Sequence, residues 1–434
     1  MSEHVEIIQE TSIRETPRNG VIREINLRLS RTEPMESILS KYLFKTSITL
    51  ESQQQKAENE LEWLKKTIKP KVKLPKRILK SCDLFSGCGG ITAGLERACT
   101  NNDMQLDVVM GCDLFSAAAT SFKDNFNPKM FLDEPIEKYV DGALESELTE
   151  NEKKLKQRLG EIDVVVGGPP CQGNSNLNNH TRRWDSRNEL YMRMIRFVEV
   201  VRPKIVLIEN VRGVTSARQN VIPRAKQHLD RLGYISYSAV IKGILIGIPQ
   251  TRVRHFTLAV LKDATKSSNQ EFHDICEDLC KPNVSTARPV SWAIEDLLGE
   301  NKPGLFDSGP DATKINQDRM NYLHKNNLWI LPNKERPPCQ QKTHTYPAVY
   351  GRMKWNEPAP TLTTGFGCNG RGKFTHPKEA RVLTPHEAAR VQTFPDFFLF
   401  EKIQKRTELH AIIGNAVPPL MASHILEKLI PMLK

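Results

Sequence analysis

The sequence shows little sign of a secretory leader or of an apolar run long enough to cross a membrane, and we expect neither. Its N-terminus, "MSEHVEIIQETSIRE", has no basic start followed by an apolar core. No later stretch approaches the ~20 apolar residues that a membrane span needs. We therefore expect a protein with no membrane partner, which works in the cytoplasm of a bacterium or in the nucleus of a eukaryote.

The sequence also lacks the dense, even cysteine spacing of a disulfide scaffold, since its nine cysteines are spread along 434 residues. The nearest approach to a metal pattern is His273, Cys276 and Cys280. That spacing is also the spacing of one helix face, and no second ligand pair follows. We expect most cysteines to be small buried residues in a reducing compartment, and we expect no metal.

Acidic residues do not balance the basic ones. Lys plus Arg number 62 against 51 Asp plus Glu, which leaves a formal net charge of +11. This surplus favours a polyanionic partner. The length allows two or three structural units, and the sequence shows no internal repeat.

From residue 77 onward, short apolar runs alternate with helical segments. This rhythm predicts an α/β fold: a doubly wound, mostly parallel sheet with helices on both faces. In such a sheet, functional residues gather beyond the carboxyl ends of the strands. The runs that we expect to form strands are "RILKSCDLF", "LDVVMGCD", "IDVVVGG", "KIVLIENV", "YSAVIKGILIGIP" and "HFTLAVL".

A glycine-rich turn, "DLFSGCGG", follows the first expected strand. Gly87, Gly89 and Gly90 allow a ligand to approach the backbone at the start of a helix. The spacing is not that of a dinucleotide site, and there is no Gly-Lys-Ser/Thr for a triphosphate. Asp113 ends the next strand, where a carboxylate can accept hydrogen bonds from ribose hydroxyls. The turn therefore indicates an adenosine derivative without a pyrophosphate.

The third strand leads into "GGPPCQGNS". Pro169 and Pro170 cannot continue a central strand, so the chain must leave the sheet and present Cys171 at its carboxyl edge. Cys171 has no metal partners and belongs to no disulfide framework, which leaves a nucleophile or a structural thiol. Glu209, in "LIENV", would reach the same crevice, and a carboxyl among apolar residues tends to keep its proton.

Arg252 and Arg254 lie two residues apart in "QTRVR", so in an extended segment they project to the same face. With the motifs above and the late "IGNAVPP", they form an ordered set that resembles the DNA cytosine-5 methyltransferases from about residue 77 to the C-terminus. The resemblance implies the Rossmann-like methyltransferase fold with a small target-recognition domain. It also implies S-adenosyl-L-methionine as cofactor and double-stranded DNA as partner.

The resemblance divides the chain at specific boundaries. Residues 1–76 would be a charged N-terminal extension, 77–298 the catalytic domain, 299–380 the target-recognition region and 381–434 a segment that returns to the catalytic domain. Within the extension, Glu51 to Lys66 has the composition of an exposed helix. A separate DNA-binding module is the alternative for the extension, which we rank below a flexible arm because no helix-turn-helix pattern is present.

The resemblance also implies roles for individual residues. Cys171 would add to carbon 6 of cytosine while Glu209 holds ring nitrogen 3. Arg254 would hold the carbonyl oxygen of the ring, with Arg252 supporting the site. The target base must leave the duplex to be reached. Glu134 is the alternative to Asp133 at the adenine. The residues implied to bind the cofactor are Phe85, Ser86, Gly87, Gly89, Gly90, Asp113, Asp133, Pro170 and Asn415.

The segment after the cysteine would close over the flipped base, with Arg182, Arg183 and Arg187 near phosphates. Asn174 stands where most members of the family have an aromatic residue. In the recognition region, "YGRMKWNEPAPTLTT", with Arg352 and Thr361 to Thr364, resembles its organising motif. The candidates there for contact with bases or phosphates are His324, Lys325, Arg336 and His344.

Two other functions stay open. One is a transfer RNA methyltransferase of the same family, which typically has an aromatic and basic run where this chain has "GNSN". The other is an inactive regulatory homologue, although the cysteine, the Glu-Asn-Val and the glycine turn are all present. We favour a stand-alone enzyme of the bacterial restriction-modification or orphan type, monomeric on DNA, with a possible cognate restriction endonuclease.

Overall fold

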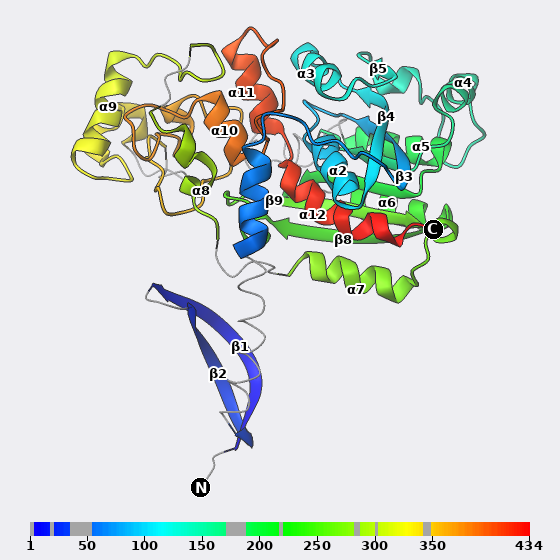
Figure 1. Ribbon diagram of the computed structural model, residues 1–434, viewed down its shortest axis with the longest axis horizontal. Coiled ribbons are helices and arrows are strands. Elements are labelled where there is room, and N and C mark those ends of the chain that lie inside the picture. The colour runs from blue at the N-terminus through cyan, green and yellow to red at the C-terminus, as the bar shows by residue number, and fades with distance from the viewer. Residues whose placement is uncertain are drawn as a thin grey trace. The chain divides into compact units, whose positions relative to one another are not determined.

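The computed structural model describes residues 4–17, 21–34, 54–170, 188–216, 220–281, 287–299, 303–341 and 349–434 (Figure 1). The chain divides into two compact units, Met1–Glu60 and Leu61–Lys434. In the first unit, strands β1 (His4–Pro17) and β2 (Val21–Pro34) pair in antiparallel fashion. We had expected a flexible arm there, and the structure instead contains a two-stranded ribbon.

The second unit is built on a seven-stranded sheet with the order β5-β4-β3-β6-β7-β9-β8. The strands from β5 to β7 are parallel, whereas β9 runs antiparallel to both of its neighbours. The mostly parallel sheet was expected, but the short β5 and the reversal of β9 were not. The strands are β3 (Arg77–Leu84), β4 (Met104–Cys112), β5 (Met130–Leu132), β6 (Val164–Gly167), β7 (Ile205–Val211), β8 (Tyr234–Lys242) and β9 (Val253–Leu261).

Helices cover both faces of this sheet (Figure 1). Alternate residues of the central strands supply the two cores: Val164 and Val166 contribute to one, and Val165 to the other. The helices of the second unit include α2 (Gly90–Asn101), α3 (Ser116–Phe126), α4 (Glu150–Leu159), α5 (Asn188–Val201), α6 (Val221–Arg231), α7 (Asn269–Leu279), α8 (Val290–Ile294), α9 (Lys314–Lys325), α10 (Pro385–Val391), α11 (Arg406–Asn415) and α12 (Pro419–Leu429).

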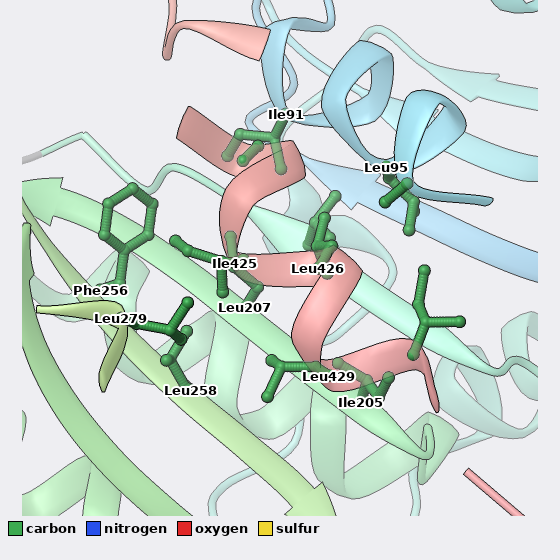
Figure 2. Close-up of a cluster of buried hydrophobic side chains, with 14 of the residues drawn as sticks. Ile91, Leu95, Ile205, Leu207, Phe256, Leu258, Leu279, Ile425, Leu426 and Leu429 are labelled. Atoms are coloured by element: carbon green, nitrogen blue, oxygen red, sulfur yellow. The ribbon is translucent and has the colours of Figure 1, made fainter. Parts of the chain in front are cut away.

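One core lies between the sheet and the helices α2, α7 and α12. Figure 2 shows Ile425, Leu426 and Leu429 of α12 among side chains from the other helices and from strands β7 and β9. Gly94 lets α2 and α12 approach closely, because a Cβ there would lie 2.4 Å from the Pro419 carbonyl oxygen. Helix α12 is thus packed into the core of the α/β unit. Cys276 on α7 is buried in the same core, which agrees with the helix-face interpretation of the His273, Cys276 and Cys280 spacing.

A helix at residues 54–64 precedes β3. Our expectation of an exposed helix is wrong for its end, because Trp63 and Leu64 are 9% and 0% exposed and belong to the hydrophobic core. The Leu64 carbonyl accepts a hydrogen bond from the Asp396 amide at 2.9 Å, and Arg97 lies over the Trp63 ring. Composition misled us because only the last turn of a polar helix is apolar.

One segment has the length and composition of a membrane span, contrary to our expectation. It runs from Arg406 to Met432 and includes α11 and α12, and 83% of its most apolar window is buried inside the protein. Core helices pass the same test, since burial in a protein interior also selects apolar residues.

Charged side chains around His386 and Arg390 join segments that lie far apart in the sequence. His386, on α10, lies 2.7 Å from an Asp307 carboxylate oxygen and 3.0 Å from an Asp396 oxygen. Arg390 donates to Asp396 and to Asp296. Burial opposes a charge on His386, but the two aspartates outweigh it, so its pKa is raised above the usual value.

We predict that Leu64→Ala lowers the free energy of unfolding by about 2–5 kcal/mol, since it opens a cavity in the core. Urea denaturation followed by circular dichroism measures this change. Ile68, four residues away and 82% exposed, provides the control, because Ile68→Ala should change the stability by no more than about 0.5 kcal/mol. Equal effects of the two substitutions would contradict the burial of the helix end.

We also predict that the His386 ion pairs stabilise the protein most at low pH. Since the pKa of His386 is raised in the folded state, its contribution is complete below the unfolded value of about 6.5 and is lost as the pH rises through the folded value. His386→Gln should remove that loss when denaturation midpoints are compared from pH 6 to pH 9.

His410 is the matched control for this comparison. Burial lowers its pKa to about 4, so near pH 6 it binds a proton only in the unfolded state, and its contribution to stability rises as the pH passes the unfolded value of about 6.5. His410→Gln should therefore change the slope of stability with pH in the direction opposite to His386→Gln. An unchanged slope in His386→Gln would show that His386 carries no charge in the folded protein.

Candidate functional site

The glycine turn joins β3 to α2 at the carboxyl edge of the sheet. Phe85, Gly87 and Gly89 have φ angles of 55°, 54° and 96°, in the left-handed region. The Ser86 amide donates to the Cys112 carbonyl at 2.9 Å, which holds the turn against the end of β4. A Cβ on Gly87 would meet nothing within 4 Å, so the turn leaves open space on that side. This geometry gives the backbone room for a ligand.

Asp113 follows β4 and faces this turn. One carboxylate oxygen accepts from the Gly87 amide at 2.8 Å, and the other accepts from the Phe115 amide at 2.9 Å. Burial raises the pKa of Asp113, although these hydrogen bonds act in the opposite direction. Each oxygen retains a second lone pair, so the carboxylate can still accept from hydroxyl groups.

Sequence reasoning missed Leu114 and Phe115, which follow Asp113 and are 64% and 39% exposed. Large apolar side chains at the carboxyl edge of a sheet suit the face of a flat aromatic ligand. The signal in the sequence was a pair of large apolar residues placed directly after Asp113 and directly before α3.

Asp83, at the end of β3, was also missed. One of its oxygens accepts from the Thr92 hydroxyl at 2.6 Å, and the other is buried without a hydrogen bond. Burial raises its pKa to about 8; the Thr92 hydrogen bond lowers it and the Asp113 charge raises it. A carboxyl with a free oxygen beneath the glycine turn is a polar group that a ligand can satisfy.

Asp133 and Glu134 follow β5, next to β4 in the sheet. The Glu134 carboxylate is held by Lys138 Nζ at 2.7 Å and by the Tyr139 hydroxyl at 3.1 Å. Asp133 is exposed and comes first after the strand. The Glu134 carboxylate is thus engaged by its own helical turn and by Tyr139, and the choice of Asp133 at the adenine stays a prediction.

The strand that precedes Cys171 ends beside the glycine turn. The Gly168 amide donates to the Leu84 carbonyl at 3.2 Å, and Asn210 Nδ2 donates to the Pro169 carbonyl at 3.3 Å. A Cβ on Gly168 would lie 3.3 Å from Glu209 Oε2. The described chain stops at Pro170, so Cys171 itself lies outside the described residues, as do Asn174, Arg182, Arg183 and Arg187.

Glu209 and Arg254 meet at this edge. Arg254 Nε lies 2.8 Å from Glu209 Oε1, and both side chains are largely buried, at 16% and 14% exposure for Arg254 and Glu209. Because β9 is antiparallel to β7, its first residues lie opposite the last residues of β7, and Arg254 pairs with Val211 in the register. We expected apolar surroundings for Glu209; its neighbour is instead a guanidinium.

Arg252 lies deeper than Arg254, at 1% exposure. Its guanidinium donates to the Leu362 carbonyl at 3.1 Å and to the Asn415 carbonyl at 3.4 Å. Burial and the Arg254 charge lower its pKa, while Glu209 raises it. Arg252 therefore links the residues just before β9 to Asn415, which is exposed at the end of α11.

The candidates for DNA contact in the recognition region have internal partners. His324 hydrogen-bonds to the His376 carbonyl at 3.2 Å, and Arg336 donates to the Leu331 carbonyl at 2.8 Å. Arg352 is buried, bonds the Pro377 carbonyl and lies over the Trp329 ring. These three side chains hold the region together. Lys325, at the end of α9, is exposed, and His344 lies outside the described residues.

A cavity of about 350 Å³ lies between α5, α6 and the segment at residues 142–144, and none of the predicted site residues lines it. Arg196, in its wall, is fully engaged with Glu152 and with the Ser146 and Glu147 carbonyls. These contacts give Arg196 a structural role in the cavity wall.

Comparisons with known proteins agree with this arrangement. Residues 79–431 match the family model "C-5 cytosine-specific DNA methylase". The chain is 42% identical to "Type II methyltransferase M1.BsuMI" of Bacillus subtilis over 82% of its length and 81% of that protein. It is 27% identical to "Type II methyltransferase M.DdeI" of Desulfomicrobium norvegicum, over 80% and 87%.

Among solved structures, a putative DNA modification methyltransferase of an Escherichia coli prophage matches with a TM-score of 0.58 at 24% identity, covering 82% of this chain and 99% of that one. The S. pombe Dnmt2 methyltransferase matches with a TM-score of 0.53 at 16% identity, over 82% and 98%. Both show the fold, which is the Rossmann-like methyltransferase fold that the motifs imply. With the family model matching most of its length, the chain belongs to the C-5 cytosine-specific DNA methylases and is a DNA cytosine-5 methyltransferase.

Proposed function

We propose that the protein transfers a methyl group from S-adenosyl-L-methionine to carbon 5 of a flipped-out cytosine in a short duplex DNA sequence, through a covalent cysteine adduct. The observation that carries this proposal is the Glu209–Arg254 ion pair beside Gly168, three residues before Cys171. A base-holding pair and a nucleophile at one sheet edge are what this chemistry requires.

The residues around the glycine turn fit the cofactor. The backbone from Phe85 to Gly90 has open space at Gly87, and Asp83 offers a buried oxygen that lacks a partner. Asp113 would accept from the ribose hydroxyls, with Leu114 against the adenine and Asp133 near its amino group. Pro170 and Asn415 would border the same pocket. S-adenosyl-L-methionine, when bound, supplies a methyl group made electrophilic by its sulfonium.

Cysteine addition activates the base. The Cys171 thiolate forms a bond to carbon 6, and Glu209 holds or supplies a proton at ring nitrogen 3, which makes carbon 5 nucleophilic. Arg254 would orient the carbonyl oxygen of the ring. The methyl group moves to carbon 5 and leaves S-adenosylhomocysteine as product. A base then removes the carbon 5 proton, the bond between sulfur and carbon 6 breaks to release the Cys171 thiolate, and a proton supplied at nitrogen 3 returns to Glu209. Cytosine must be extruded from the duplex for these atoms to meet.

The Arg254 guanidinium is held by two contacts within the protein. Its Nε holds Glu209, and Nη1 donates to the Val253 carbonyl at 2.8 Å. The ion pair fixes the orientation of the carboxyl before a base arrives, so its side chain needs little reordering on binding. Such preorganisation is how buried charged groups contribute to catalysis.

The biological setting that we propose is DNA modification in the bacterial cytoplasm. Two relatives named above are Type II methyltransferases. The +11 net charge favours DNA binding by the whole protein. We propose that the enzyme acts as a monomer on DNA and that a cognate restriction endonuclease recognises the same sequence.

Bisulfite sequencing of plasmid DNA from cells that express the protein tests this function and identifies the target sequence. We predict 5-methylcytosine at one position of one short sequence. Purified protein with labelled S-adenosyl-L-methionine should methylate the same plasmid isolated from cells that lack the protein, and it should leave transfer RNA unlabelled. Label in transfer RNA alone would establish the transfer RNA alternative, and no label in either substrate would support the inactive regulatory homologue.

We further predict that Cys171→Ser lowers methyl transfer by on the order of a thousandfold or more, because a hydroxyl is a far weaker nucleophile than a thiolate. Calorimetric affinity for S-adenosylhomocysteine should stay unchanged. A target duplex with 5-fluorocytosine should trap the wild-type protein covalently, since fluorine cannot leave as a proton does.

Cys368, which is exposed, gives the control: Cys368→Ser should retain full activity and trapping. Peptide mapping of the trapped complex identifies the modified residue. Attachment at a cysteine other than Cys171 would show that the nucleophile is misassigned.

A further inference from the structure

Two buried glutamines face each other behind the proposed site. Gln250 and Gln392 are both 0% exposed, and Gln250 Nε2 donates to Gln392 Oε1 at 3.0 Å. They are 142 residues apart in sequence. Burying a side-chain amide costs free energy unless its polar atoms form hydrogen bonds. The other hydrogen bonds of each amide therefore show which parts of the chain it holds.

Gln392 holds the end of α11. Its Nε2 donates to the Ile413 carbonyl at 2.7 Å, with the Gly414 and Ala416 carbonyls at 3.4 and 3.3 Å. The last carbonyls of a helix have no partners within it. One amide therefore gathers the carbonyls on both sides of Asn415, the residue that we propose to border the cofactor.

Gln250 holds the recognition region. Its Oε1 accepts from the Leu362 amide at 2.9 Å, and its backbone forms a parallel bridge with Ala359. The next residue, Thr251, donates to the Ala359 carbonyl at 2.8 Å. These contacts fix the segment at residues 359–362 against the residues that lead directly into Arg252 and Arg254.

The end of α11, which Gln392 holds, also contacts the segment that Gln250 holds. A Cβ on Gly414 would lie 2.5 Å from Thr363 C, so the end of α11 packs against the backbone of the Thr361 to Thr364 motif. Arg252 then joins Leu362 to Asn415 through its guanidinium. The glutamine pair, Arg252 and this contact form a closed, buried ring of interactions.

We infer that Gln392 is a positioning residue that holds Asn415 and, through Gln250, the Arg252–Arg254 segment in register, so that cofactor binding and the binding of the base depend on one buried amide. The inference rests on the proposed function and deepens it. Gln392 touches neither ligand; it acts through the carbonyls of α11 and through Gln250.

The test is Gln392→Met, which keeps the length of the side chain and removes its hydrogen bonds. Calorimetry with S-adenosyl-L-methionine should give a Kd weakened by about tenfold, and the single-turnover methylation rate at saturating cofactor should also fall by about tenfold. Both are measured well below the melting temperature of the variant. In the Asn415→Ala background, Gln392→Met should weaken the Kd by less than about twofold more, because the residue it positions is already gone.

Tyr234→Phe is the matched control. Tyr234 is 1% exposed and donates to the Pro203 carbonyl at 2.6 Å, at the start of β8, opposite to the end of the sheet that carries Arg254. The Tyr234→Phe variant loses a buried hydrogen bond and should have a lower melting temperature, with an unchanged Kd for the cofactor and an unchanged single-turnover rate. If Gln392→Met behaves like this control, or if its effect on Kd adds fully to that of Asn415→Ala, the inference is wrong.

Assays of the wild-type protein distinguish a failure of this inference from a failure of the proposed function. Methylation by the wild type together with normal Kd and rate in Gln392→Met rejects the positioning role and leaves the function intact. A wild-type protein that binds cofactor but methylates no DNA rejects the proposed function, and the inference with it.

Discussion

The reversal of β9 is the constraint on which the site depends. In a sheet of parallel strands, side chains at the amino end of a strand lie far from the carboxyl edge. Because β9 is antiparallel to β7, its first residues arrive at the edge where β7 ends. Arg254 can therefore reach Glu209, and Arg252 can reach the carbonyls of Leu362 and Asn415.

The order of the strands explains why the glycine turn and the segment at Gly168 to Pro170 are neighbours. The chain leaves β3 for β4 and β5 on one side and continues through β6 and β7 on the other. A ligand crevice forms at such a switch point, because the two connecting segments diverge there. Here those segments are the glycine turn after Leu84 and the turn at Gly168 to Pro170, which share the Leu84 carbonyl.

The parts of the chain around this edge are held by buried polar contacts. His386 and Arg390 join α10 to the segments that carry Asp307 and Asp296, while Gln250 and Gln392 attach the end of α11. Such groups are stable in a protein interior only when their partners are placed accurately. This requirement makes polar contacts good positioning devices, since a small displacement leaves an unsatisfied donor or acceptor.

The sequence by itself determined the fold class and the family, and it gave each motif an expected role. These features could be predicted because alternating apolar runs and glycine or proline turns act locally. It also indicated that Arg252 and Arg254 act together. Asp83, Leu114 and Phe115 were missed since each reads as an ordinary strand or loop residue, and the end of the helix at residues 54–64 was taken for an exposed surface. Only the tertiary structure decided the direction of β9, the pairing of Glu209 with Arg254 and the meeting of Gln250 with Gln392. Those contacts join residues far apart in the chain, and pairing at such separations depends on how whole elements pack rather than on any local pattern.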